Sequence, residues 1–309
     1  MAGKIVVFGS FVVDLMSRSS HLPSPGETVK GSLFKMGAGG KGFNQGVASH
    51  KSGGDTVMIT RLGKDAFAQV ALDAMKELGM DDSNVIVTED TSTGAALILV
   101  DEKTSQNEIV VIPGACGAFT ESDVEGCRSV LEEADYLLVQ LEVNPEATYQ
   151  AVEIAYKAGA QVVLNPAPAC PVEDDLLKMV TIVTPNEVEA EILTGINCDT
   201  EEGLAGAAAW FHAKGVRYAV ITLGHRGVYI SGEGEHMLIP AFRVDAIDTT
   251  GAGDAFNGGF LTALAEGRSV DEASVFGCAV AALSVQRMGT TPAMPTRQEV
   301  EDFLSGHVE

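Results

Sequence analysis

Short apolar runs rich in β-branched residues alternate along the chain with longer segments whose apolar positions recur at helical spacing. The short runs have the length and composition of strands buried on both faces, and they lie at residues 4–8, 57–60, 136–141, 161–164, 181–184 and 218–223. Between them, helices are predicted at 67–78, closed by Gly79, and at 145–158. Because strands alternate with helices, we expect an α/β fold with a mostly parallel sheet flanked by helices on both faces.

Two regions break this alternation. Residues from about 11 to 36 hold short apolar runs around a Leu-Pro-Ser-Pro-Gly turn at 22–26, and residues 93–112 have the pattern of a hairpin. Strands without crossover helices indicate a small β-sheet lid beside the main sheet, suited to covering a ligand and excluding water. Since no repeat or linker divides the chain, residues 1–309 are expected to form a single α/β domain that carries this lid.

Composition narrows the classes of function. The chain has 309 residues and is 46% hydrophobic, enough for a large core, and its formal net charge of -23 argues against nucleic acid or an anionic membrane as a partner. Five scattered cysteines form no CxxC pair and no zinc-binding spacing, which favours a reducing, cytoplasmic location. Residues 5–8 are expected to form a buried strand rather than a signal peptide, and no apolar run reaches the roughly 18 residues of a membrane span.

The clearest chemical signal is a glycine-rich turn, Gly251-Ala252-Gly253, predicted to join an apolar strand at about 244–248 to a helix. These residues have almost no side chain, so their amides can approach a ligand closely, and the helix start adds unpaired N–H groups and a positive dipole end. The turn is therefore a candidate anion site. Asp254 is placed to take a proton from a hydroxyl while the amides stabilise a phosphoryl group, or alternatively to cap the helix.

A second glycine cluster occupies residues 37–46 and formally matches the GxGxxG pattern. A dinucleotide site is not favoured, because the cluster does not follow the first strand and the window 57–62 contains no acidic residue. The P-loop pattern also fails, since Lys41 is followed by Gly42 where Ser or Thr is needed. What remains is either a structural turn or a polar turn that presents Lys41 and Asn44 to sugar hydroxyls or phosphate oxygens.

Together, the two clusters resemble the signatures of the ribokinase-like carbohydrate kinases, and the similarity is greatest to the ribokinase and deoxyribokinase branch. Residues 39–45 look like the first family signature and residues 248–256 like the second. Between them, four further family blocks occur in the expected order: Gln140-Leu141-Glu142, Asn165-Pro166-Ala167-Pro168, Pro185-Asn186-Glu187-Val188-Glu189 and Thr222-Leu223-Gly224-His225-Arg226-Gly227. The resemblance covers nearly the whole chain.

The resemblance implies a role for each matching residue. Asp254 would be the catalytic base, with Gly251, Ala252 and Gly253 as the anion hole. The sugar-binding residues would be Val12, Asp14, Gly39, Gly40, Lys41, Asn44 and Glu142. On the nucleotide side, Asn186 and Glu189 would arrange the ATP phosphates and Mg²⁺ through water, and Thr222, Gly224 and Gly227 would lie beside the nucleotide. A tight turn explains these two glycines equally well. Asp14 and Glu142 follow predicted strands, where ligands bind in parallel sheets, although each could also cap the next element.

The resemblance also implies a monovalent-cation site, filled by K⁺ and formed by carbonyl oxygens of Asp248, Thr250, Ser284, Arg287 and Gly289. The chain departs from the family pattern here, because Ala293 stands where a serine hydroxyl is usual. The expected site therefore lacks one of its usual polar groups.

A second departure concerns the substrate. Family members that act on ribose place an asparagine near the 2-hydroxyl of the sugar, and this chain has Val12 at that position. A pocket without that polar partner disfavours a hydroxyl and tolerates hydrogen, so 2-deoxyribose is a candidate beside ribose. Alternatively, Val12 only fills the core.

The sequence as a whole predicts an ATP- and Mg²⁺-dependent kinase that phosphorylates the 5-hydroxyl of D-ribose or 2-deoxy-D-ribose. Exposed lid strands and family habit predict a homodimer. Two alternatives stay open: a kinase of the same superfamily for another sugar, a sugar acid or a nucleoside, and a non-catalytic sugar-binding regulator, although the latter would not need Asp254.

Overall fold

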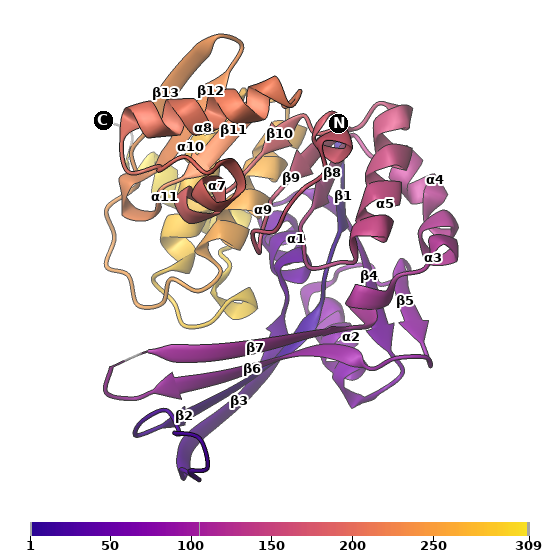
Figure 1. Cartoon of the computed structure of the whole chain (residues 1–309), viewed down its shortest axis with the longest axis vertical. Coiled ribbons are helices and arrows are strands. Elements are labelled where there is room, and N and C mark those ends of the chain that lie inside the picture. The colour runs from indigo at the N-terminus through magenta and orange to yellow at the C-terminus, as the bar shows by residue number, and fades with distance from the viewer. Residues whose placement is uncertain (1, 105, 308–309) are drawn as a thin grey trace.

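The computed structural model describes residues 2–104 and 106–307, and its main body is built on a nine-stranded sheet (Figure 1). From β5 to β11 all neighbouring strands are parallel, and an antiparallel hairpin, β12–β13, extends the far edge. In spatial order the strands are β13 (Glu235–Ile239), β12 (Val228–Gly232), β11 (Tyr218–Thr222), β10 (Ile182–Val183), β9 (Gln161–Leu164), β8 (Tyr136–Val139), β1 (Lys4–Phe8), β4 (Asp55–Gly63) and β5 (Val85–Thr88).

Helices pack on both faces of this sheet, as the alternating pattern predicts. In β1, Ile5 and Val7 face one hydrophobic layer while Val6 and Phe8 face the other. The first layer contains α1 (Lys41–Lys51), α2 (Ala66–Leu78), α9 (Ala252–Ala265), α10 (Val270–Ser284) and α11 (Arg297–Ser305). The second contains α3 (Glu121–Gly126), α4 (Arg128–Glu132), α5 (Pro145–Ala158), α6 (Asp174–Leu177), α7 (Glu187–Thr194) and α8 (Glu201–Ala213). Short 3₁₀ helices lie at Ala115–Ala118, Gly224–Arg226 and Thr291–Ala293.

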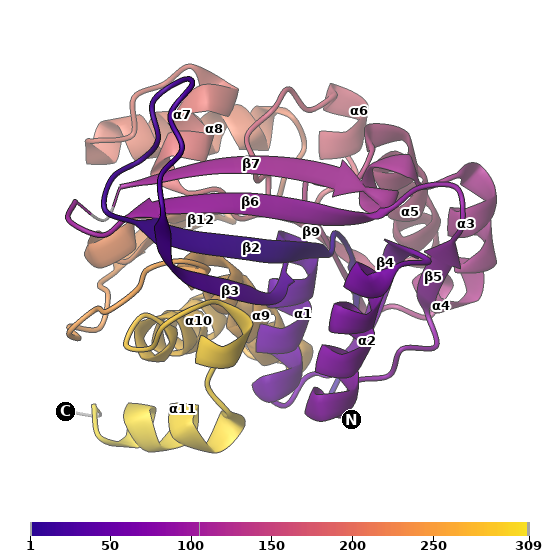
Figure 2. The same ribbon diagram turned by 90° about the horizontal axis from the view of Figure 1, so that it is seen from below.

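A separate four-stranded sheet projects from the body and forms the expected lid, which Figure 2 shows from below. We call it the β lid; its strands, in spatial order, are β3 (Gly31–Gly39), β2 (Val12–Ser19), β6 (Thr93–Asp101) and β7 (Asn107–Gly114). Strand β2 follows β1 after three residues, so the base of the lid lies at the carboxyl end of β1. The lid is therefore positioned over the sheet edge where parallel α/β proteins bind ligands.

Three strands, β5, β12 and β13, have no counterpart among the predicted strands. All three are short and lie at or next to a sheet edge, each has an apolar run of only three residues, and most side chains of β13 are exposed. The strand expected at about 244–248 is wrong. This segment is irregular, and the backbone N–H groups of Ile247 and Asp248 both donate to the carbonyl of Val285 instead of to a strand.

The start of α1 packs directly against the connection between β1 and β2. A Cβ atom on Gly42 would lie 2.5 Å from the backbone nitrogen of Ser10, so only glycine allows this approach. The N–H of Phe43 donates to the carbonyl of Ser10 at 2.9 Å. This contact fixes Lys41 and Asn44 beside the carboxyl end of β1.

Two expectations from composition can be compared with the structure. The five cysteines are free thiols, and four of them are buried. Among residues 2–104 and 106–307, no helix combines the length and the hydropathy that a bilayer crossing requires.

Candidate active site

Asp254 lies in the first turn of α9, directly after the turn Gly251-Ala252-Gly253. Its side chain is buried, and it does not cap its own helix: its Oδ2 accepts a hydrogen bond from Asn44 Nδ2 at 3.1 Å, and its Oδ1 accepts one from Gln45 Nε2 at 2.9 Å. The helix begins at Gly251, which has φ of 76° and offers no side-chain cap. The capping alternative for Asp254 is therefore wrong, and the two glycine clusters meet at its carboxylate.

Burial raises the pKa of Asp254, although the charge of Lys41 and the amide donors of Gln45 and Asn44 act in the opposite direction. A carboxylate with a raised pKa and direct hydrogen-bond donors is suited to accept a proton. For Lys41, burial favours the neutral amine, but the charges of Asp254, Glu142 and Glu189 outweigh it and raise the pKa. Lys41 is thus a fixed ammonium among three carboxylates.

The proposed sugar residues gather where the β lid joins the body. One oxygen of Glu142 accepts from the Lys41 backbone N–H at 2.9 Å and from Ser10 Oγ, so this carboxylate caps α1 rather than the next helix, α5. Asp14 lies in β2, and burial, with the charges of Glu142 and Asp254, raises its pKa to about 6. The Asp14 carboxylate packs against Gly39, where a Cβ atom would lie 2.4 Å from Oδ2.

The two remaining positions of this set also lie at the lid base. Gly40 is the N-cap residue of α1 with φ of 91°. Val12 begins β2 and points to the same face of the strand as Asp14, because the side-chain period of a strand is two. Val12 is only 5% exposed and packs against Gly94 of β6. A cavity of about 740 Å³ lies between the lid and the body and is lined by Asp14 on one side and Thr291 on the other.

The proposed nucleotide residues lie along the next strand ends. Asn186 and Glu189 form a reciprocal capping box at the start of α7: Asn186 N–H donates to Glu189 Oε2 at 2.9 Å, and Glu189 N–H donates to Asn186 Oδ1 at 2.7 Å. Burial raises the pKa of Glu189, although the Asn186 N–H and the charge of Lys41 act in the opposite direction. Asn186 pairs with Thr222 in an isolated parallel bridge.

Gly224 and Gly227 form the tight turn after Thr222. Both have positive φ, 55° and 105°, and a Cβ atom on Gly227 would lie 1.9 Å from the carbonyl oxygen of Ile239. Backbone geometry alone accounts for these two glycines, and their position at the strand end places them beside Asn186.

Two loops, 247–250 and 284–291, meet where the monovalent cation is expected. The carboxylate of Asp248 joins them, accepting from the N–H of Thr250 at 3.0 Å and from the N–H of Gly289 at 2.9 Å. Burial alone raises the pKa of Asp248, but these donors outweigh it and hold the pKa below its usual range. Ser284 and Arg287 lie in one turn, with the Arg287 N–H on the Ser284 carbonyl, and Ala293 is buried nearby. The five proposed residues are therefore close together, and Ala293 provides no hydroxyl.

Sequence reasoning missed Gln45 and Thr291. Gln45 contacts Asp254 directly, and Thr291 Oγ1 donates to Asn44 Oδ1 at 3.2 Å. Gln45 lies within the first family block, directly after Asn44. A polar residue at a buried position of α1 was the feature of the sequence that could have indicated it. Thr291 is far away in sequence and carries no comparable signal.

A mostly parallel α/β sheet, a β lid and a buried carboxylate beside a glycine turn define the class of sugar-phosphorylating kinases with this architecture. The model of the pfkB family carbohydrate kinases matches residues 2–297, and the chain belongs to this family. It is an ATP-dependent carbohydrate kinase.

Individual relatives agree with this membership. The chain is 42% identical to the ribokinase of Haemophilus influenzae over 98% of its own length and 99% of that protein. It is 36% identical to the deoxyribokinase of Salmonella typhimurium over 97% and 98% of the two chains. The structure of Arabidopsis thaliana ribokinase complexed with ribose and ATP superposes with a TM-score of 0.91 at 32% identity, covering 98% of this chain and 99% of that one.

Proposed function

We propose that the protein transfers the γ-phosphoryl group of ATP to the 5-hydroxyl of D-ribose or 2-deoxy-D-ribose. The observation that carries this proposal is the buried contact of Asp254 with Asn44 and Gln45, which joins the anion turn and the first glycine cluster in one site. The similarity to ribokinases and a deoxyribokinase supports a pentose as the acceptor.

In this mechanism Asp254 accepts the proton of the attacking hydroxyl, and the glycine turn stabilises the charge of the transferred phosphoryl group. The Ala252 N–H already donates to the Thr249 carbonyl at 3.2 Å, so we assign the anion contact mainly to the amides of Gly251 and Gly253. Asp14, Glu142 and Lys41 orient the sugar, with Gly39 and Gly40 giving it access to the backbone. Positioning and charge stabilisation supply most of the rate.

Magnesium fits the charges of the site. Asp254, Glu142 and Glu189 surround Lys41, and the charge of Asp14 adds to those of Glu142 and Asp254, so a triphosphate would enter a negative field without an accompanying cation. Asn186 and Glu189 present hard oxygen atoms, which suit Mg²⁺ held through water. Bound Mg²⁺ would neutralise charge on the phosphates as the phosphoryl group moves.

We also propose a monovalent cation beside the anion turn, where Asp248 joins the loops 247–250 and 284–291 through its bonds to Thr250 and Gly289. Because both oxygens of Asp248 already accept from backbone N–H groups, carbonyl oxygens would be the main ligands for K⁺. Ala293 offers no hydroxyl to this site.

The β lid supports a homodimer. Its edge strand β7 exposes Ile109, Val110, Val111 and Ile112, and β3 at the opposite edge exposes Phe34 and Met36. Apolar side chains on both faces of an edge strand, with unpaired backbone groups, are suited to pairing with a second copy of the chain. We place the protein in the cytoplasm, in line with its five free thiols.

A coupled assay of ADP release tests the function directly. The purified protein is titrated with ribose, 2-deoxyribose, several hexoses and several nucleosides at saturating Mg²⁺ and ATP. We expect kcat/KM to be highest for one of the two pentoses, with product mass locating one added phosphoryl group. A hexose or nucleoside with a higher kcat/KM than both pentoses would refute the assignment.

A further inference from the structure

A chain of buried amide and hydroxyl groups runs from Asp254 through the sheet and returns to its own helix. Gln45 Nε2 donates both to Asp254 Oδ1 and to Asn165 Oδ1, each at 2.9 Å. Asn165 Nδ2 donates to the carbonyl of Thr184 at 2.8 Å, and Thr184 Oγ1 donates to Asn257 Oδ1 at 2.6 Å. The path closes where Asn257 Nδ2 donates to the carbonyl of Gly253 at 2.8 Å. We call this path the amide ring.

The ring connects three structural units at the catalytic end of the sheet. Gln45 comes from α1, Asn165 and Thr184 follow the ends of β9 and β10, and Asn257 and Asp254 lie in α9. The members are buried, so water competes little for their hydrogen bonds. Helices α1 and α9 also touch through their backbones here: a Cβ atom on Gly258 would lie 2.6 Å from the carbonyl oxygen of Gln45.

Gln45 is the member whose orientation is determined most completely. An amide side chain offers two N–H donors, and in Gln45 these are used by Asp254 and Asn165. Its Oε1 accepts from Gln140 Nε2 at 2.7 Å. Rotating the amide by half a turn would set oxygen against the oxygens of Asp254 and Asn165, so the network permits one orientation.

We propose that Gln45 is a positioning residue for catalysis: through the amide ring it holds the Asp254 carboxylate in register with the glycine turn that receives the phosphoryl group. This inference rests on the proposed role of Asp254 as the general base. The ring has a member bonded to the Asp254 carboxylate and a member bonded to the Gly253 carbonyl, so it couples the proton acceptor to the anion turn.

The ring also affects the charge of Asp254. The Gln45 donor stabilises the ionised carboxylate, together with Asn44 and the charge of Lys41, while burial and the charge of Glu142 favour the protonated form. Asp14 and Glu189 are further carboxylates whose charges interact with Asp254. Without Gln45 the pKa of Asp254 would rise further, so the acidic limb of the kcat profile would move to higher pH.

The test is Gln45→Met, which keeps the length and approximate volume of the side chain and removes its donors. The variant loses a hydrogen bond to a charged group. We therefore expect kcat to fall by about 10- to 150-fold and the acidic limb of the kcat profile to move up by about one to two pH units. The KM values for sugar and ATP should change by less than about threefold, because the ring touches neither ligand in the proposed mechanism.

A second variant separates the two ends of the ring. Thr184→Val removes the donor to Asn257 and keeps the shape of the side chain, so Gln45 and Asn44 still hold Asp254. We expect kcat to fall about 2- to 13-fold while the acidic limb stays where it is in the native protein. This variant decides the question if Gln45→Met does not fold: unchanged kcat in folded Thr184→Val overturns the proposal.

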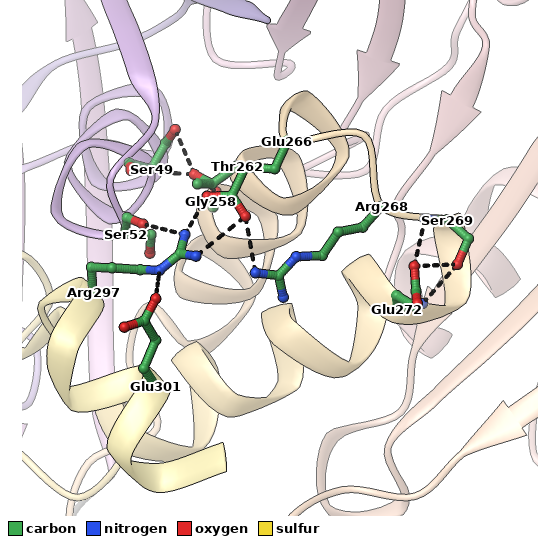
Figure 3. Close-up of polar contacts among 10 residues, drawn as sticks. All are labelled: Ser49, Ser52, Gly258, Thr262, Glu266, Arg268, Ser269, Glu272, Arg297 and Glu301. Atoms are coloured by element: carbon green, nitrogen blue, oxygen red, sulfur yellow. Dashed lines mark hydrogen bonds and ion pairs between the residues drawn. The ribbon is translucent and has the colours of Figure 1, made fainter. Parts of the chain in front are cut away.

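Thr262→Val is the matched control, because it removes polar contacts between the same two helices away from the site. Figure 3 shows Thr262 on α9 beside Ser49 and Gly258; its hydroxyl bonds with the Ser49 carbonyl at 3.2 Å and the Gly258 carbonyl at 2.9 Å. Thr262 lies about 12 Å along the helix from Asp254, at 1.5 Å per residue. We expect kcat within about twofold of the native value and an unchanged pH profile.

The outcomes separate this inference from the proposed function. If Gln45→Met leaves the pH profile in place, or if Thr262→Val moves it equally, Gln45 has only a packing role. If Asp254→Asn retains full activity, the base assignment fails and the inference fails with it. An inactive Asp254→Asn beside a fully active Gln45→Met would overturn the role of Gln45 alone.

Discussion

Replacing Asp254 with Asn should abolish most of the activity and leave the fold intact. The substitution converts one carboxylate oxygen into an NH₂ group. Both groups that face this carboxylate, Asn44 Nδ2 and Gln45 Nε2, are donors, so either orientation of the new amide sets one donor against another. One hydrogen bond is therefore lost whichever way the amide turns.

The size of each effect follows from these contacts. The lost hydrogen bond and the lost attraction to Lys41 destabilise the variant, but removing a buried charge offsets part of this cost, so the net change in stability should stay within about 3 kcal/mol. Catalysis has no such compensation, because a neutral amide cannot accept the proton. General-base catalysis typically contributes about 10²- to 10⁴-fold, and kcat should fall by that factor.

The assay is steady-state kinetics with calorimetric titration of ATP, and with thermal unfolding as the check of the fold. The matched control is Asp73→Asn, which should behave as the native protein. Asp73 is an exposed carboxylate in α2 that accepts a hydrogen bond from Gln69. ATP affinity should be retained in Asp254→Asn. Activity within about threefold of the native protein, a difference of about 0.65 kcal/mol, would remove Asp254 from the role of base.

Three further predictions concern the sugar side of the site. Lys41→Ala and Asn44→Ala should raise the KM for sugar more than the KM for ATP, as measured by separate titrations of the two substrates. A larger rise in the KM for ATP would assign the glycine cluster at residues 37–46 to the nucleotide. Val12→Asn should shift kcat/KM toward ribose over 2-deoxyribose by about 2- to 13-fold, the value of one hydrogen bond, measured by competition and product mass; no shift would leave Val12 as packing only. Asp14→Asn should stabilise the fold at pH 7 by at most about 3 kcal/mol. The pKa of Asp14 is about 6 in the folded protein against 3.8 for a free carboxyl, so ionisation of Asp14 destabilises the folded state increasingly as pH rises from 3.8 to 6. Unfolding at pH 7 and pH 4 checks this, since the gain should disappear at the lower pH.

The apolar pattern was sufficient for the interior of the fold and insufficient at its edges. The helix Pro145–Ala158 and the strands Lys4–Phe8 and Gln161–Leu164 have the predicted limits, because proline, glycine and buried runs mark them locally. Strand β13 was missed because most of its side chains are exposed, and β12 because its buried apolar run has only three residues; pairing partners rather than local composition determine such strands. The irregular path before Gly251 depends on the Val285 carbonyl, which is distant in sequence.

The same distinction applies to the site. Glycine turns and the residues beside them are visible in sequence because close backbone approach needs glycine, and this placed Lys41, Asn44 and Asp254 correctly at helix starts. The sequence could not show which donors face Asp254. Its hydrogen-bond partners lie more than 200 residues away in the chain, so only the packing of α1 against α9 shows that this carboxylate bonds to α1 instead of capping its own helix.

The charges of the site explain how a protein with a net charge of -23 can bind a triphosphate. Lys41 keeps its proton because three carboxylates surround it. Burial raises the pKa values of Asp254, Asp14 and Glu189, so these carboxylates bind protons more readily than exposed ones. A neutral sugar can enter this field without electrostatic cost, whereas ATP needs an accompanying cation. This balance of charge leads to two possible behaviours. Either the sugar binds before ATP, or the affinity for ATP depends steeply on the Mg²⁺ concentration. Measuring the ATP dissociation constant with and without sugar across a Mg²⁺ series distinguishes them, and an ATP affinity independent of both would contradict the electrostatic reasoning.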